Sequence, residues 1–170
     1  MTADRIHIVQ GEFAVGQGEK TVISTLLGSC VACCIWDEVA AVGGMNHMLF
    51  ATGRTHLAID TLADINSIEV LINALTRLGA DRKRLQAKAF GGARMLGGLS
   101  DIGQQNAEFT LRYLKSEGID VVTHSLGGNR ARNIKFWPAS GRVMQRVSQE
   151  DVQDPVQQHQ SAVGNGLELF

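Results

Sequence analysis

The stretch VACCIWDEVAAVGGMNHML, residues 31–49, decides the fold. It holds two short apolar runs, Val31–Trp36 and Val42–Leu49, separated by an acidic break at Asp37-Glu38. Apolar runs of this length, bounded by turn residues, are typical of β-strands. A tight turn at the break would bring the second run beside the first. The sequence therefore predicts two neighbouring strands at the centre of the fold.

The rest of the chain shows two helical patterns among further strands. Apolar residues recur at three- and four-residue intervals over Thr61–Leu78, and Gly79 is a natural C-terminal cap. A second helix is expected over Gln104–Glu117, with Gly118 at its end. Further strands are expected at residues 6–9, 21–27, 87–90, 121–124, 133–136 and 142–147. This order predicts an α/β fold of the α+β type, with mixed β-sheets flanked by helices.

Composition narrows the class of protein. The chain has 170 residues, 44% of them hydrophobic, and a net charge of -1, which describes a globular domain that buries a core without disulfides or metals. It lacks the basic excess of nucleic-acid-binding proteins. No run of about 18 apolar residues occurs, so membrane insertion is not expected. Three clustered cysteines fit a reducing compartment, and we expect the protein in the cytoplasm.

The composition changes after Val147. Residues 148–160 are rich in Gln, Asp and Glu and have no apolar periodicity, so we expect a flexible C-terminal tail over residues 148–170. The tail ends in the apolar segment Gly166–Phe170. Two interpretations stay open for this segment: a loosely docked terminus, or a short peptide that adds to the sheet edge of a partner.

The cysteine cluster invites a metal site, but strand geometry argues against one. Cys30 and Cys33 have the spacing of zinc ligands, yet in a strand they point to opposite faces. Cys30 and Cys34 share a face but lie roughly 13 Å apart at about 3.3 Å per residue, too far for one ion or for a disulfide. We therefore expect no metal, and interpret Cys33 and Cys34 as small core residues.

Cys30 and His47 form the candidate catalytic pair. An imidazole beside a thiol can take its proton and so generate the nucleophilic thiolate. If the two central strands are neighbours, His47 lies close to Cys30. The residues alone also allow a buried structural thiol and a hydrogen-bonded core histidine.

Several blocks of the sequence resemble one family. Leu27-Gly28-Ser29-Cys30-Val31-Ala32, followed by Gly43-Gly44-Met45-Asn46-His47, resembles the chemoreceptor glutamine deamidase family, CheD. The likeness continues through residues 69–73, 88–93, 103–113 and 126–132. It implies a CheD-like deamidase domain over residues 1–147, similar in fold to the catalytic domain of the cytotoxic necrotizing factors.

The resemblance also implies an activity and partners. Such an enzyme hydrolyses glutamine side chains on the cytoplasmic helices of chemotaxis receptors to glutamates, releases ammonia and needs no cofactor. A possible second partner is the CheC phosphatase, and the alternative function is a non-enzymatic binding module that regulates CheC.

The site residues implied by the resemblance fall into two groups. Cys30 is the expected nucleophile and His47 its base, and the third catalytic residue is an upstream threonine. Thr25 is the candidate for it, and Ser24 stays open as the alternative. The expected substrate-binding or oxyanion residues are Ser29, Gly28 and Asn46.

Overall fold

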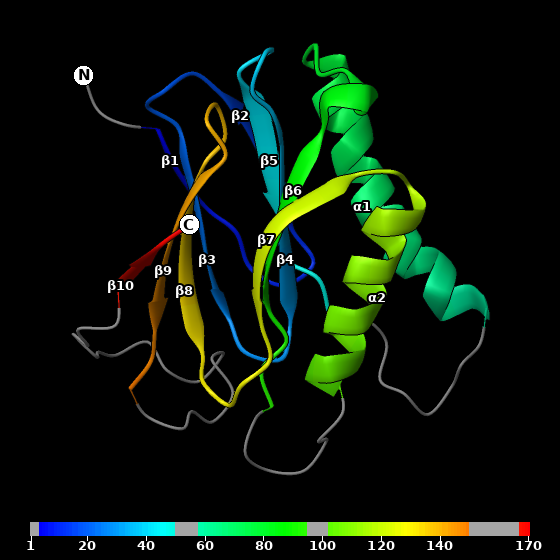
Figure 1. Cartoon of the computed structure of the whole chain (residues 1–170), viewed down its shortest axis with the longest axis vertical. Coiled ribbons are helices and arrows are strands. Elements are labelled where there is room, and N and C mark those ends of the chain that lie inside the picture. Colours follow the sequence, from blue (N-terminus) through cyan, green and yellow to red (C-terminus); the bar gives the residue numbers. More distant parts are fainter. Residues whose placement is uncertain (1–3, 50–57, 95–101, 150–166) are drawn as a thin grey trace.

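The strands of the computed structural model form two sheets that pack face to face (Figure 1). The structure describes residues 4–49, 58–94, 102–149 and 167–170. Within these ranges the first sheet has the order β1 (Arg5–His7), β3 (Val22–Leu27), β8 (Arg132–Trp137), β9 (Arg142–Val147) and β10 (Leu167–Leu169). The second has the order β2 (Phe13–Gln17), β5 (Val42–Asn46), β4 (Val31–Asp37), β6 (Gln86–Gly91) and β7 (Asp120–Leu126).

Two helices cover the outer face of the second sheet. In Figure 1, α1 (Ala58–Arg77) and α2 (Ile102–Ser116) lie on the side away from the first sheet. A 3-10 turn, η1 (Arg82–Arg84), leads from α1 into β6. Strand pairs β1–β3 and β6–β7 are parallel, and the other pairs are antiparallel. The predicted α+β class with mixed sheets is confirmed, whereas the likeness to the necrotizing factors stays a prediction.

The central strand β4 separates two cores. All seven of its residues are buried. Val31, Cys33 and Ile35 pack toward the helices, against α1 residues such as Leu71 and Leu75. The alternate positions Ala32, Cys34 and Trp36 pack between the sheets, with first-sheet residues that include Ile23, Ile134 and Phe136. The prediction that Cys33 and Cys34 fill the core is confirmed, because both are fully buried.

The predicted helices and strands are present, with shifted ends. The helix predicted at residues 61–78 is α1, and Gly79 follows it at a φ of +102°, a conformation that favours glycine at a helix end. β2 was not predicted. It is an edge strand of half-exposed and exposed residues, so it lacks the apolar alternation that marks a strand in a sequence.

The end of the chain differs from the predicted flexible tail. Leu167–Leu169 pairs antiparallel with β9, and Phe170 exchanges backbone hydrogen bonds with Val143 (2.8 and 2.9 Å). The Phe170 ring meets the Phe90 ring edge-on at 5.6 Å between centroids. The segment therefore adds a strand to its own sheet. Residues 150–166 of the predicted tail lie outside the described residues.

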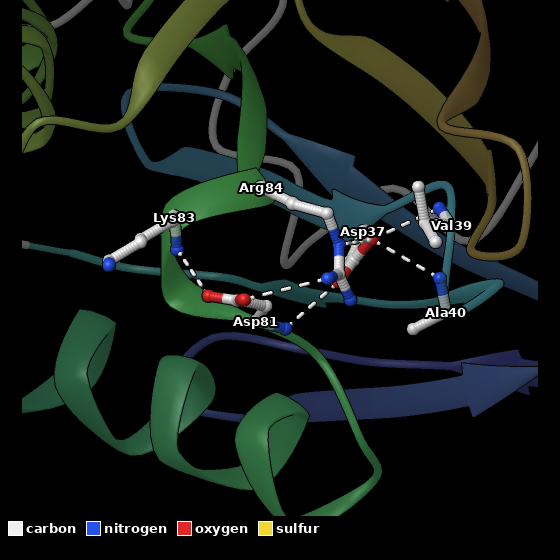
Figure 2. Close-up of polar contacts among 6 residues, drawn as sticks. All are labelled: Asp37, Val39, Ala40, Asp81, Lys83 and Arg84. Carbon is white, nitrogen blue, oxygen red and sulfur yellow. Dashed lines mark hydrogen bonds and ion pairs between the residues drawn. The ribbon is translucent and has the colours of Figure 1, made fainter.

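A buried carboxylate fixes the turn between β4 and β5. Asp37 ends β4 and accepts hydrogen bonds from the backbone N–H groups of Val39, Ala40 and Asp81 (Figure 2). It also forms an ion pair with Arg84, at 2.8 Å between Oδ2 and a terminal guanidinium nitrogen. These contacts, the Arg84 hydrogen bond first, lower the pKa of Asp37 to about 2. The acidic break of the sequence is thus an anchor that ties this turn to the segment after α1.

Candidate active site

Cys30 lies in the short connection between β3 and β4, where the chain crosses from one sheet to the other. It is 8% exposed and packs in the core between the sheets. None of the three cysteines forms a disulfide. Cys30 and Cys33 belong to different cores, and Cys30 and Cys34 to the same one, as the strand geometry predicted. Among the described residues, no three His, Cys, Asp or Glu side chains gather as a metal site would require.

The strand register brings His47 to the face that carries Cys30. Cys34 pairs with Met45, and the same register continues to a bridge between Val31 and Met48. The Val31 and Met48 backbones exchange hydrogen bonds of 2.9 and 2.8 Å. His47 therefore lies opposite Ala32, diagonally across from Cys30. Such diagonal neighbours on one face have Cβ atoms about 7 Å apart or less, which a thiol and an imidazole can span.

A hydrogen bond to Thr25 fixes the tautomer of His47. The Thr25 hydroxyl donates to the Ile8 carbonyl oxygen (2.8 Å) and lies 2.7 Å from His47 Nδ1. Its single proton is used at Ile8, so its oxygen must accept from Nδ1–H. The neutral imidazole then carries its free lone pair on Nε2, where a proton acceptor toward Cys30 is needed.

Burial keeps the imidazole of His47 neutral. The side chain is 7% exposed, and loss of solvation lowers its pKa to about 4, with a further lowering by His7 and an opposing effect of Glu12. The backbone is held as well, because His47 N–H donates to Glu12 and its carbonyl accepts from Gly11 (3.0 and 2.9 Å). At neutral pH His47 is therefore a positioned base.

The structure places Thr25 at His47 and Ser24 away from it. Thr25 is fully buried between the sheets. Ser24, the next residue along the strand, points to the other face, where its hydroxyl lies 3.1 Å from His7 Nδ1. Of the two alternatives, only Thr25 contacts the candidate base.

Residues 28–30 form the turn that carries the candidate nucleophile Cys30, which we call the nucleophile turn. Hydrogen bonds from the residues that directly follow β6 hold this turn. The Gly28 carbonyl accepts from Ala93 N–H (3.0 Å), and the Cys30 carbonyl accepts from Gly92 N–H (2.9 Å). Gly28, one of the expected substrate-binding or oxyanion residues, is buried. Ser29, between them, is partly exposed.

Asn46 lies outside the site that was expected to include it. Its side chain is on the helix-facing side of the sheet, where Oδ1 accepts from Cys33 N–H (2.9 Å) and Nδ2 contacts Met48 Sδ (3.0 Å). Successive residues of a strand point to opposite faces, so Asn46 turns away when His47 faces Cys30. We therefore assign it to the support of the strands that carry His47, and not to substrate or oxyanion binding.

Two residues behind the site were not found from the sequence. Gly91 has a φ of +109°, and a methyl group on it would collide with the Cys30 carbonyl oxygen. Arg132 is buried, and its guanidinium donates to the carbonyl oxygens of Gly91 and Gly127 (both 2.6 Å). The Gly91-Gly92 pair after a strand was a signal of close backbone approach, whereas nothing in the sequence marked Arg132 as buried.

The fold and site define a class: a two-sheet α+β protein in which a cysteine lies on the same face as a histidine that is hydrogen-bonded to a threonine, the residue types that a thiol hydrolase uses. Residues 63–147 match the family model described as CheD chemotactic sensory transduction. A relative named "Probable chemoreceptor glutamine deamidase CheD" from Agrobacterium fabrum is 48% identical over 84% of this chain and 80% of its own. A relative of the same name from Cereibacter sphaeroides is 50% identical over 86% of this chain and 74% of its own. The chain belongs to the CheD family.

A structural comparison adds less. A solved protein from Neisseria meningitidis aligns over 74% of this chain and 63% of its own length, with a TM-score of 0.46 and 11% identity. That likeness is too remote to assign a function. In the described part of the chain, neither helix is long and apolar enough to cross a membrane.

Proposed function

We propose that this protein is a protein-glutamine deamidase that hydrolyses glutamine side chains of chemotaxis receptors to glutamate and ammonia. The observation that carries the proposal is the Thr25–His47 hydrogen bond, because it leaves Nε2 of a neutral imidazole unprotonated on the face that bears Cys30. A histidine that only fills the core is also hydrogen-bonded, but it has no need to leave its other nitrogen unprotonated on the face of a cysteine. The names of the CheD relatives supply the substrate class.

The first half of the reaction forms a thioester. His47 Nε2 takes the proton of the Cys30 thiol as the sulfur attacks the amide carbon of the glutamine side chain. Negative charge develops on the amide oxygen, and the backbone N–H groups of Ser29 and Cys30 stabilise it. The protonated His47 then gives its proton to the leaving nitrogen, ammonia departs, and the glutamyl group remains on sulfur.

The second half of the reaction hydrolyses the thioester and regenerates the free enzyme. His47, neutral again, takes a proton from water as the water oxygen attacks the thioester carbon. The tetrahedral intermediate expels the thiolate, which recovers its proton from His47, and glutamate is released. Because the pKa of His47 is lowered to about 4, its imidazole is neutral at rest and has not taken the Cys30 proton. The proton therefore moves as the carbon–sulfur bond forms, and not before substrate binds.

The substrate and location follow from the same proposal. Receptor glutamines of this kind lie on cytoplasmic helices, so the protein works in the cytoplasm. The alternative, a binding module that regulates the CheC phosphatase, requires no base of fixed tautomer beside the thiol. CheC binding is therefore a second property to test by co-purification, and the deamidase is the function that the geometry supports.

The test replaces the nucleophile and a matched cysteine. Cys30→Ala should abolish the conversion of receptor glutamines to glutamates, read by mass spectrometry of receptor peptides after co-expression. Cys33→Ala is the control, since Cys33 is equally buried but its side chain packs in the other core, on the face of β4 away from His47. Deamidation that survives in Cys30→Ala, or that is lost equally in both variants, contradicts the nucleophile assignment.

A further inference from the structure

A side chain from α2 reaches the middle of the nucleophile turn. The Nδ2 of Asn106 donates to the Ser29 carbonyl oxygen at 2.9 Å, across 77 positions of sequence. Asn106 is 1% exposed. Because a backbone carbonyl only accepts hydrogen bonds, the group that faces it must be the amide NH2. This contact completes a series, since the carbonyls on either side, of Gly28 and Cys30, are held by Ala93 and Gly92.

The start of α2 packs closely against Gly92 and Ala93, the two residues whose N–H groups hold the nucleophile turn. A Cβ on Gly103 would lie 2.6 Å from the Gly92 carbonyl oxygen, so only glycine allows this approach. The close approach sets Asn106, one helical turn later, over Ser29. The carbonyls of the three consecutive turn residues 28–30 are thus each held by a hydrogen bond, from Ala93, Asn106 and Gly92 respectively.

Peptide geometry carries this contact to the reacting atoms. In a trans peptide the C=O and the N–H of one plane point in opposite directions, and no cis peptide occurs among the described residues. The Ser29 carbonyl points outward to α2. The N–H of the same plane belongs to Cys30, and it therefore points away from α2. The Cys30 side chain also lies away from the helices, in the core between the sheets.

We propose that Asn106 is a positioning residue that aims the Cys30 N–H at the oxyanion. The proposal rests on the deamidase function above and adds the residue that orients its oxyanion donor. Asn106 touches no reacting atom; it acts by holding the Ser29–Cys30 peptide plane in place while charge grows on the substrate oxygen. A donor on the carbonyl also polarises the peptide, which strengthens its N–H as a donor at the other end.

Two variants separate this role from a structural one. Asn106→Ala should lower kcat by about 10-fold or more, up to the roughly 100- to 1000-fold seen when an oxyanion-hole donor itself is lost, with little change in KM. Its Cys30 should react with iodoacetamide at the wild-type rate, because alkylation forms no oxyanion. Thr110→Val is the control: Thr110 is buried on the same helix and its hydroxyl donates to the Asn106 carbonyl (2.8 Å), but in the described part of the chain it forms no hydrogen bond with the turn. It should keep kcat.

A third variant tests the donor itself. Asn106→Asp has the same shape, but donates to the Ser29 carbonyl only when its carboxyl is protonated. Its kcat, divided by that of the wild type at each pH, should therefore rise as pH falls. A flat ratio, or an Asn106→Ala kcat within threefold of Thr110→Val, overturns the proposal. So does an alkylation rate that falls in parallel with kcat, since the thiol and not the oxyanion would then be affected.

The wild-type protein keeps the two proposals apart. If the wild type converts receptor glutamines and Asn106→Ala does so equally well, the role of Asn106 is refuted and the deamidase stands. If the wild type itself leaves a receptor cytoplasmic fragment unchanged, the deamidase fails, and the role of Asn106 fails with it.

Discussion

Thr25→Val isolates the hydroxyl that sets the His47 tautomer. Valine keeps the shape of threonine, and position 25 is fully buried, so the substitution removes one oxygen from a closed space. It leaves two groups without their partner: His47 Nδ1–H and the Ile8 carbonyl. Each such buried polar group costs about 1–3 kcal/mol, so unfolding in urea should show a loss of about 2–6 kcal/mol.

The same substitution should slow deamidation. Without Thr25 the imidazole can adopt the tautomer with the proton on Nε2, which cannot accept from Cys30. In the correct tautomer the Nδ1–H would then be buried without an acceptor, which costs about 1–3 kcal/mol and corresponds to about 5- to 150-fold in kcat.

The assay for this prediction combines kinetics with spectroscopy. Deamidation of a receptor fragment is followed by mass spectrometry, and nitrogen NMR shifts report which His47 nitrogen carries the proton. Thr25→Ser should restore the wild-type tautomer and most of the rate, and Ser24→Ala, on the other face of β3, should change neither. A wild-type spectrum with the proton on Nε2, or full activity in Thr25→Val, would refute the reasoning.

The remaining predictions concern the support of the nucleophile and the response to acid. Gly91→Ala should lower kcat by about tenfold or more, because its methyl group displaces the Cys30 carbonyl and its φ of +109° disfavours alanine; an unchanged kcat would contradict this contact. His47 binds a proton with a pKa of about 4 when folded and 6.5 when unfolded, so stability present above pH 6.5 should be lost as pH falls toward 4, by about 3 kcal/mol. Urea unfolding of His47→Gln should lack this part of the pH dependence, and an equal dependence in both proteins would exclude His47 as its source.

Local pattern predicted the strands and helices, and pleat alternation separated Cys30 from Cys33. The choice between Ser24 and Thr25 stayed open, because which face of this strand meets His47 depends on how the two sheets stack. β10 was also not predicted. It pairs with β9, from which it is separated in the sequence by the polar residues 150–166, and a polar composition by itself predicts a flexible tail. Asn106 and Arg132 act through contacts between elements far apart in sequence, which no local pattern records.

The most direct test of the central claim is the fate of receptor glutamines in isotopically labelled water. The purified protein is incubated with a receptor cytoplasmic fragment, and peptides are sequenced by mass spectrometry. The account predicts glutamates that carry one heavy oxygen from water, formed by the wild type and by Cys33→Ala and absent with Cys30→Ala. Glutamines that remain unchanged with the wild type, or labelled glutamates that form with Cys30→Ala, would contradict it.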